Sequence, residues 1–450
     1  MNFFRKQNSL RYIAFGFLVV IFIGSGLLMI PGCVKEGVTL HYHDALFTST
    51  SAVCVTGLIV VDVADTFTIA GQVIVMLLIQ IGGLGVTTLG AGLVIALRRR
   101  ISLKERSILQ ETLNLDDAKS LFALFKRVFI YTFVIEMLGA CLSMITFFKA
   151  PDYAGPGQAV FRSFFHSVAA FNNSGFDIMG GLTNFTIAPY NNDVFFNLLT
   201  CALIILGGLG FLVISDTFRN ITHFKKTSLH TKVVLLMTFI LLVSGTLLVA
   251  LTEYHRIQDG SFTWLGAFFA SVTSRTAGFS TYNFSEFTRS GQIIIIILMF
   301  IGASPGSTGG GIKTTTLFVL VMGVRSIINH KKPHAFKYSI SEEAVKKALS
   351  VAFLSLTLVI TGTFILCMIE RENWSAQSPF STIDAIFEVT SAFGTVGLST
   401  GLTPLLSVGS KMLLVIIMYL GRVGPLTFMS SWHSGKDEYF SYAEGVIPIG

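Results

Sequence analysis

The sequence predicts an all-α polytopic membrane protein with four parallel helix–pore loop–helix repeats around a central pore, making eight membrane helices and four half-helices. Of its 450 residues, 52% are hydrophobic and only 13% are charged, against roughly 25% charged in soluble domains. Uncharged runs near twenty residues recur along the chain, whereas a soluble core seldom contains even one run of about eighteen. A short pattern that ends in glycine also occurs four times. Together these observations favour a membrane-embedded helical repeat protein.

Seven apolar runs are long enough to cross a hydrocarbon layer of roughly 30 Å as helices. They are Tyr12–Ile30, Gln72–Leu97, Val128–Phe148, Val194–Ile214, Val233–Thr252, Leu349–Ile369 and Met412–Met429. The first run could be mistaken for a signal peptide, but it is too long and no A-x-A cleavage pattern follows it. We expect it to be a retained helix.

The repeated pattern aligns on Gly57, Gly175, Gly278 and Gly397. A phenylalanine lies ten residues before each glycine, and a large apolar residue follows each one. A single Phe-x9-Gly has no weight in a chain with 41 Phe and 42 Gly. Four copies at the same place in the hydropathy pattern indicate an internal repeat.

The fourth copy, Ile383 to Gly401, indicates what the pattern does physically. Its apolar part of about twelve residues would span roughly 18 Å as a helix, so we expect it to enter the membrane and turn back. A half-helix points the negative end of its dipole at the turn, and glycine lets backbone carbonyls approach a ligand closely. These features favour a cation. The predicted filter residues are Val55, Thr56, Gly57, Asn173, Ser174, Gly175, Thr276, Ala277, Gly278, Thr395, Val396 and Gly397.

Each repeat has the same expected order: a helix out, an external linker, a half-helix in, and a return helix that ends in basic residues. The repeats are assigned to residues 1–100, 101–220, 221–330 and 331–450, the last with a short cytoplasmic tail. Two crossings per repeat give all copies one orientation, as in parallel repeats about an axis along the membrane normal. Four half-helices around such an axis meet at one centre, where carbonyls can replace the hydration shell of an ion.

The positive charge follows the expected topology. Of the 32 Lys and Arg residues, 22 lie before the first helix, in the connections after the return helices, or in the tail. By the positive-inside rule, the N-terminus and these connections face the cytoplasm of a cell whose membrane holds the protein. This bias explains the net charge of +7, and we expect no nucleic acid partner.

The return helices share a glycine feature that is expanded in the third repeat. There, five glycines and a proline within residues 302–311 cannot hold a helix, at roughly 1 kcal/mol per glycine and 3 per proline. An irregular loop in lipid would leave amides without partners, so it should face the cavity below the filter, as a gate or as a plain hinge. The predicted gate residues are Gly302, Ser304, Pro305, Gly306, Gly309, Gly310, Gly311, Lys313 and Arg422.

Two charges in this region have alternative interpretations. Arg422 and Lys313 lie at membrane depth, where charge is expensive. Each could be an anchor paired with a carboxylate or carbonyls, or Arg422 could meet the 302–311 loop on the pore axis as a barrier to cations. A phosphate-binding loop is disfavoured, because Gly306-x4-Gly311-Ile312-Lys313-Thr314 has one residue too many for the motif.

The remaining charged residues near the turns are less defined. We expect Arg275 to brace the third turn from behind, since a cation in the lumen would repel the transported ion. Asp44 and Asp384 open half-helices and are expected to cap them. Glu136 and Glu388 receive no role from the sequence.

Other functional classes find little support. The five cysteines show neither a disulfide framework nor zinc-ligand spacing. No His, Asp or Glu cluster with ligand or triad spacing falls within the spans, so we expect neither an enzyme nor a bound cofactor.

With these motifs in place, the chain resembles the Trk/Ktr/HKT superfamily of potassium transporters, and especially the membrane subunit of the bacterial Ktr system. The resemblance rests on the four repeats, one filter glycine per copy, Thr395-Val396-Gly397, and the broken third return helix. The Thr-Val-Gly sequence also resembles the TVGYG filter of potassium channels, although no copy carries the following Tyr-Gly.

The resemblance implies potassium uptake through the four glycines, because serine at the first position accompanies sodium transport in relatives. It also implies a gate at 302–311, a homodimer of two separate pores, and a cytoplasmic ring of nucleotide-binding regulatory subunits. Sodium dependence, the nucleotide, and channel-like or carrier-like kinetics stay open. An alternating-access carrier of a small cation or solute is the alternative function.

Overall fold

The computed structural model describes residues 9–85, 121–149, 155–180, 187–220, 223–373 and 381–425. Helices dominate this part of the chain, and its one sheet is a two-stranded antiparallel hairpin of β1 (His334–Ala335) and β2 (Tyr338–Ser339). The basic end predicted for the first return helix and the C-terminal tail lie outside the described residues.

Each of the four segments that the sequence predicted as repeats contains, in order, a first helix, a shorter helix at the place of the predicted half-helix, and a return helix. The first helices are α1 (Ser9–Leu28), α7 (Leu121–Phe147), α11 (Leu229–Thr252) and α16 (Glu342–Ile369). The half-helices are α2 (Tyr42–Cys54), α8 (Pro156–Phe171), α13 (Trp264–Thr273) and α17 (Thr382–Gly394). The return helices are α4 (Ile69–Leu84), α9 (Val194–Leu209) with α10 (Phe211–Arg219), α14 (Arg289–Phe300) with α15 (Thr314–Asn329), and α18 (Val408–Val423).

Short helices complete the fold. The α-helical ones are α3 (Val63–Thr66) and α12 (Tyr254–Gln258), and the 3₁₀ turns are Pro31–Cys33, Ala188–Tyr190, Phe224–Lys226, Phe284–Glu286 and Thr403–Leu405. We call the side where the half-helices begin the half-helix face, and the side that carries β1 and β2 the hairpin face.

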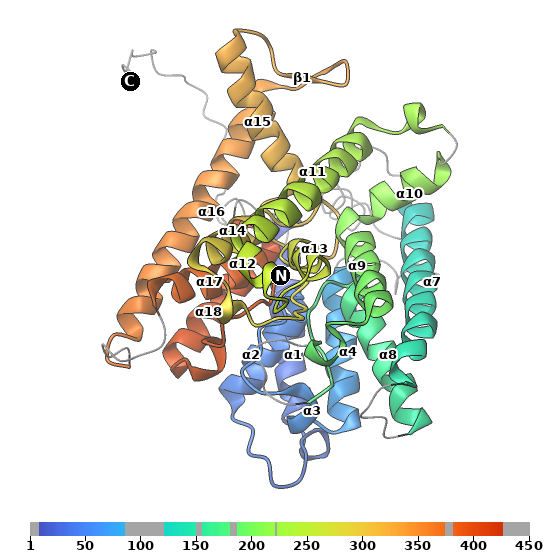
Figure 1. Ribbon diagram of the computed structural model, residues 1–450, viewed down its shortest axis with the longest axis vertical. Helices are drawn as coiled ribbons and strands as arrows, with labels where there is room; N and C mark the ends of the chain where they lie inside the picture. Colours follow the sequence, from blue (N-terminus) through green and yellow to red (C-terminus); the bar gives the residue numbers. More distant parts are fainter. Residues whose placement is uncertain are drawn as a thin grey trace, which may run out of the picture.

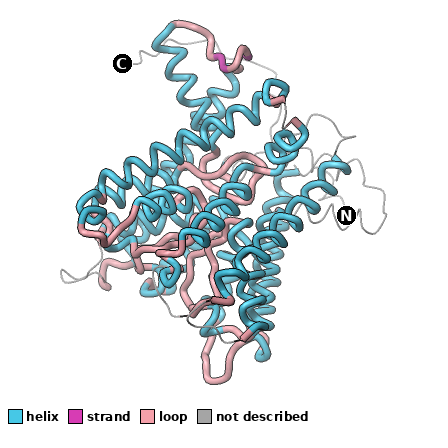
Figure 2. The backbone as a smooth tube through the Cα atoms, turned by 45° about the vertical axis from the view of Figure 1, so that its right-hand side comes forward, coloured by secondary structure: helices cyan, strands magenta, loops and turns pink. Residues whose placement is uncertain are grey.

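The helix contacts close the four repeats into a cycle. Every half-helix packs against the first and return helices of its own repeat. Each also packs against the return helix of the preceding repeat, in the pairs α8 with α4, α13 with α9, α17 with α14 and α2 with α18. In Figure 1 the second repeat lies on the right and the fourth on the left, with the first and third between them. Figure 2 shows loops gathered in the middle of the molecule, surrounded by helices.

Three helices in the described part of the chain are long and apolar enough to cross a membrane: Lys126–Phe147 within α7, α11 and α16. The pair α9 and α10 passes the same test together, but is bent by 98°. The sequence predicted one continuous span over Val194–Ile214. The break occurs at Gly210, whose φ of 91° and ψ of 145° do not belong to a helix.

The same break recurs where it was not expected. Gly85 ends α4 with φ 84° and Gly424 ends α18 with φ 90°. The described return helices therefore end at corresponding positions, at a glycine in three repeats and at the loop that precedes α15 in the third.

Small residues let each half-helix approach its first helix. A Cβ added to Gly24, Gly139 or Gly245 would lie 2.4–2.5 Å from the hydroxyl of Ser49, Ser167 or Ser271. These hydroxyls donate to carbonyls of the first helices, for example from Ser49 to Ile21 at 2.7 Å. Close backbone approach at small residues is the common solution for helices in lipid.

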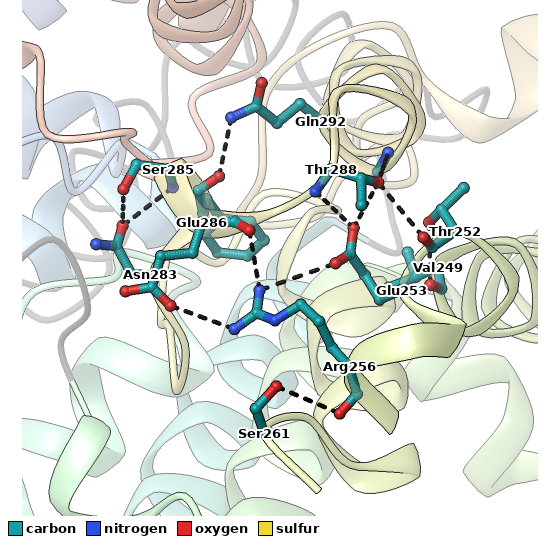
Figure 3. Close-up of polar contacts among 12 residues, drawn as sticks. Val249, Thr252, Glu253, Arg256, Ser261, Asn283, Ser285, Glu286, Thr288 and Gln292 are labelled. Atoms are coloured by element: carbon teal, nitrogen blue, oxygen red, sulfur yellow. Dashed lines mark hydrogen bonds and ion pairs between the residues drawn. The ribbon is translucent and has the colours of Figure 1, made fainter. Parts of the chain in front are cut away.

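At the half-helix face, a carboxylate joins the end of a first helix to the start of a return helix. Glu253, at the end of α11, accepts hydrogen bonds from the amide and hydroxyl of Thr288 at 2.9 and 2.8 Å (Figure 3). Arg256 lies 3.8 Å from Glu253 and 3.2 Å from Glu286. The same arrangement occurs in the fourth repeat, where Glu370 accepts hydrogen bonds from the amide and the hydroxyl of Ser407.

Candidate functional site

The four glycine turns share an unusual backbone conformation. In each turn, the glycine and the residue two positions before it have positive φ. The non-glycine members are Val55 (58°), Asn173 (58°), Thr276 (74°) and Thr395 (49°), and the glycines are Gly57 (90°), Gly175 (68°), Gly278 (79°) and Gly397 (93°). Positive φ is a genuine outlier for β-branched residues, which three of these four are. Such strain persists only where surrounding structure imposes it.

The turns touch one another in a closed ring. A Cβ added to Gly57 would lie 2.2 Å from the carbonyl oxygen of Ser174 in the next turn. An added Cβ on Gly175 would lie 2.8 Å from the Ala277 carbonyl oxygen, and one on Gly278 would lie 2.4 Å from that of Val396. An added Cβ on Gly397 would lie 2.1 Å from the carbonyl oxygen of Thr56. Each turn thus meets the next one, and the fourth meets the first. The twelve predicted filter residues are therefore brought together in one place.

Side-chain hydroxyls hold the turns in shape. Ser51 donates to the Leu58 carbonyl at 2.8 Å and accepts from the Gly57 amide at 3.0 Å. Ser391 accepts from the Gly397 amide at 3.1 Å in the fourth copy. In the third copy, Thr273 donates to the Phe279 carbonyl at 2.6 Å. These bonds satisfy buried backbone groups that a helix would otherwise pair.

The chemistry of the ring favours a cation. All four half-helices end just before their turns, so the negative ends of their dipoles face the ring. The twelve turn residues include no charged side chain, and all are buried except Gly397, which is half-buried. Carbonyl and hydroxyl oxygens in such a place can replace water around a monovalent cation without fixing it as carboxylates would.

The loop of residues 301–313 lies against the ring and against the end of α17, where a Cβ on Gly311 would lie 3.4 Å from the Cα of Gly394. The Gly310 amide donates to the hydroxyl of Thr395 at 2.9 Å. A Cβ on Gly309 would lie 2.1 Å from the hydroxyl of Thr276. The loop also pairs with the second return helix, since Ser304 donates to the Gly208 carbonyl at 3.2 Å. The loop is therefore an ordered segment in contact with three repeats.

Two cations hold this loop through its carbonyls. Arg422 donates to the carbonyls of Thr308 in the loop and of Gly82 in the first return helix. Lys313 donates to the carbonyls of Gly309 at 2.7 Å and Gly310 at 3.4 Å. The sequence left open whether Arg422 and Lys313 are anchors paired with carboxylates or carbonyls. In the structure both side chains bond backbone carbonyls. Arg422 also meets the loop directly, as its gate interpretation requires.

The other charged residues near the turns divide into three cases. Arg275 is 7% exposed, and its Nε has no partner among the described residues. Asp384 forms the expected capping box with Ser381. Asp44 instead forms an ion pair with Lys411 of α18 at 3.1 Å, which links the first and fourth repeats.

Glu388, which the sequence could not interpret, supports the fourth turn. Its side chain is fully buried and accepts hydrogen bonds from the Ser399 hydroxyl at 2.6 Å, the Thr400 amide at 2.9 Å and the Thr403 hydroxyl at 2.5 Å. These donors belong to the segment that leaves the turn. A buried acid on a half-helix one position after the repeated phenylalanine was the only available sequence signal.

Glu136 lies behind the second turn. It accepts from the Asn172 amide at 2.9 Å and from Gln80 at 3.4 Å, which joins α7, α8 and α4. Its backbone carbonyl accepts the hydroxyl of Ser167 at 2.7 Å. Glu136 therefore joins three helices of two repeats.

Known proteins match this chain over nearly its whole length. The family model TrkH, described as cation transport protein, matches residues 3–436. Ktr system potassium uptake protein B of Bacillus subtilis is 39% identical, with 98% of this chain and 96% of the relative covered. Potassium/sodium uptake protein NtpJ of Enterococcus hirae is 37% identical, with 99% and 98% covered. The crystal structure of the potassium transporter TrkH from Vibrio parahaemolyticus aligns with a TM-score of 0.70 at 17% identity, covering 96% of this chain and 87% of that one.

Proposed function

Because the chain belongs to the TrkH family of cation transport proteins, we propose that it is the membrane subunit of a potassium-uptake system. Potassium passes through the ring of turns, where carbonyls from all four repeats replace its hydration shell. The observation that supports this proposal is the ring in which each of the four turns, at Gly57, Gly175, Gly278 and Gly397, touches the next. The names of relatives that take up potassium support the choice of ion, and one of those names includes sodium.

In this proposal the gate is the segment 302–311 within the 301–313 loop. It lies directly against Thr276 and Thr395 of the ring, so an ion leaving the turns meets it next. Arg422 and Lys313 hold the loop closed through carbonyls and add positive charge below the ring, which opposes a cation until the loop moves.

The proposed assembly is a homodimer with a pore in each subunit, in the cell membrane with its N-terminus in the cytoplasm. A cytoplasmic ring of nucleotide-binding subunits docks on the hairpin face and moves the gate. Six basic residues within 325–347 support this choice of face by the positive-inside rule. Uptake by vesicles that hold the protein with and without its cytoplasmic partner tests this regulation.

Glycine substitutions test the ring. Gly57→Ser and Gly397→Ser should lower the preference for potassium over sodium most strongly, because their new Cβ atoms would lie 2.2 and 2.1 Å from backbone carbonyls. Gly175→Ser should have the smallest effect, at 2.8 Å. Rubidium and sodium fluxes into vesicles provide the measurement. Gly26→Ser is the matched control, because a Cβ at Gly26 meets nothing within 4 Å. Gly278→Ser, with its Cβ 2.4 Å from the Val396 carbonyl, should lie between these extremes. Unchanged selectivity in all four ring variants would refute the proposal.

The second candidate is an alternating-access carrier, which the 98° bend between α9 and α10 favours because carriers bind substrates at broken helices. Shortening the chain within Ser304–Gly310 separates the two functions. A gated pore should conduct faster after this change, whereas a carrier should show no gain in leak and should keep saturable, stoichiometric coupling.

A further inference from the structure

A cavity lies at the half-helix face of the second repeat, away from the ring of turns. It has a volume of about 320 Å³ and lies between the end of α7 and the chain that leads into α9. We call it the α7–α9 pocket. A water molecule takes roughly 30 Å³ of liquid, so the pocket has room for about ten groups of that size. Its lining includes Ile145, Thr146, Lys149, Tyr190, Asp193 and Phe195.

The polar ends of the two helices lie at one level. The Thr146 hydroxyl donates to Oδ2 of Asp193 at 3.1 Å, which joins the last turn of α7 to the residue that precedes α9. The apolar span within α7 ends at Phe147, and Lys149 lies two residues beyond it, or roughly 3 Å along a helix. The headgroup layer extends roughly 5–8 Å beyond the hydrocarbon. Lys149 and Asp193 therefore lie at the level of lipid headgroups.

The apolar lining of the pocket lies on the membrane side of these charges. The helix α7 runs toward the half-helix face and α9 runs away from it. Ile145 comes before Lys149 on the first path, and Phe195 comes after Asp193 on the second, so both lie deeper in the bilayer. Their side chains are 48% and 45% exposed. Acyl chains can contact them while a headgroup reaches the charged residues.

Hydrogen bonds and aromatic packing fix the shape of the pocket wall. Nδ2 of Asn197 donates to the carbonyls of Tyr190 and Asp193, both at 2.8 Å. The ring of Tyr190 packs against Phe147 and Phe196, with centroids 5.6 and 5.0 Å apart. The Phe196 amide donates to Oδ1 of Asp193 at 3.0 Å. The wall is therefore tied to the packed interior of the second repeat.

The pocket carries one charge of each sign. Lys149 is exposed and forms no ion pair with any described residue, including Asp193 across the pocket. The Asp193 carboxylate has about four acceptor sites, and the bonds from Thr146 and Phe196 leave some of them for a ligand. Asp193 repels a free anion, and Lys149 repels a metal cation. A ligand that carries both charges on a short chain is attracted by both residues.

We propose that the α7–α9 pocket binds a phospholipid whose headgroup carries a primary amine, from the leaflet on the half-helix face. Lys149 contacts the phosphate, and Asp193 accepts hydrogen bonds from the ammonium group. Ile145 and Phe195 contact the adjoining parts of the acyl chains. The bound lipid bridges α7 and α9 beside the bond between Thr146 and Asp193. This site is separate from the ring of turns and does not depend on ion transport.

The test measures lipid binding to the full chain in detergent by native mass spectrometry. Phosphatidylethanolamine, phosphatidylglycerol, phosphatidylcholine and soluble phosphoethanolamine are the probes. Phosphatidylethanolamine should bind about fivefold more tightly than the other two lipids, the upper end for an exposed ion pair. Phosphatidylglycerol has no ammonium group, and the quaternary ammonium of phosphatidylcholine has no N–H to donate. Soluble phosphoethanolamine should not compete at equal concentration, because it has no acyl chains.

Two single substitutions separate the two charges. Asp193→Asn keeps an oxygen that can cap α9 but loses the carboxylate, so phosphatidylethanolamine and phosphatidylglycerol should bind about equally. Lys149→Gln should weaken the binding of both lipids alike, by roughly a factor of five. Lys35→Gln and Glu36→Gln, at exposed positions between α1 and α2, are the matched controls and should keep the wild-type preference.

Three results would overturn the proposal. Equal binding of phosphatidylethanolamine and phosphatidylglycerol to the wild-type protein would contradict the contact between Asp193 and an ammonium group. An unchanged preference in Asp193→Asn would show that the lipid binds outside the α7–α9 pocket. Competition by soluble phosphoethanolamine would exclude the acyl-chain contacts. If Asp193→Asn does not fold, Lys149→Gln at its exposed position still decides the test, because a wild-type affinity there would contradict the phosphate contact.

Discussion

At the scale of single residues, the ring of turns depends on positions where a side chain has no room. The carbonyls of Thr56 and Val396 occupy the places where Cβ atoms of Gly397 and Gly278 would lie. Positive φ at the same glycines adds a second reason that other residues fit poorly. Elsewhere in the site, single polar side chains such as Glu388 satisfy irregular backbone that helices cannot pair. Removing one of them leaves a buried donor unpaired, at about 1–3 kcal/mol.

Glu388→Gln is expected to reduce potassium selectivity and to lower stability by about 1–3 kcal/mol. The glutamine oxygen can still accept from the Thr400 amide and the Ser399 hydroxyl, and the Thr403 hydroxyl can rotate to accept from the new amide. The loss comes from replacing bonds to a charged carboxylate by neutral ones, which are roughly half as strong. Selectivity in vesicle flux and the midpoint of thermal unfolding provide the measurements. Glu343→Gln, at an exposed site on α16, should change neither. A Glu388→Gln protein with wild-type selectivity would show that the exit segment needs no carboxylate.

At the scale of elements, hydrogen bonds to buried carboxylates hold the ends of neighbouring helices together. Glu253 at the end of α11 bonds the residue that caps α14, and Glu370 at the end of α16 bonds the residue that caps α18. The 301–313 loop is likewise held by hydrogen bonds from several repeats rather than by its own structure. An element that depends on contacts from other elements can move when those contacts change.

Glu253→Ala should lower the stability of the protein by about 3–5 kcal/mol, because it leaves Arg256 and the Thr288 amide without a buried partner. Glu286→Ala removes the other partner of Arg256, but its side chain is 60% exposed. That control should cost less than about 1 kcal/mol. Thermal unfolding of both variants in one detergent provides the comparison, and equal losses would contradict the role given to Glu253.

Arg422→Gln should raise the ion flux of the protein in the absence of its cytoplasmic partner. The substitution removes the charge that holds the Thr308 and Gly82 carbonyls together, so the loop is freer to leave the ring. Rubidium flux into vesicles measures the effect, with Arg371→Gln at an exposed position as the control. A flux that falls or stays constant would indicate that Arg422 does not hold the gate closed.

At the scale of the whole molecule, the repeats make one cycle because each half-helix packs between return helices of two repeats. The ion pair between Asp44 and Lys411 joins the first repeat to the fourth at the point where the cycle closes. A ligand at the ring would contact all four repeats at once. Ion binding should therefore stabilise the complete fold rather than one segment.

Potassium is expected to raise the thermal unfolding midpoint of the protein relative to sodium at equal ionic strength. A ligand at a hundred times its dissociation constant adds about 2.7 kcal/mol of stability when it binds only the folded state. Unfolding measured along a potassium titration tests this, and Gly397→Ser should remove the potassium dependence. The Gly26→Ser control should retain it. Equal unfolding midpoints in both salts would contradict potassium binding at the ring of turns.

Local composition determined much of this protein. Apolar runs indicated membrane helices, and the repeated glycine pattern located all four turns, because length, hydropathy and glycine spacing are properties of neighbouring residues. The sequence also placed the loop at 302–311, since glycine and proline exclude a helix wherever they cluster.

Tertiary structure decided the features that depend on residues far apart in the chain. The bend at Gly210, the partners of Glu136 and Glu388, and the pairing of Asp44 with Lys411 could not be predicted from local patterns. A buried polar group takes whichever partner the packing brings within hydrogen-bond distance, and that partner can lie hundreds of residues away. The order of carbonyls and glycines around the ring likewise exists only after four distant segments have met.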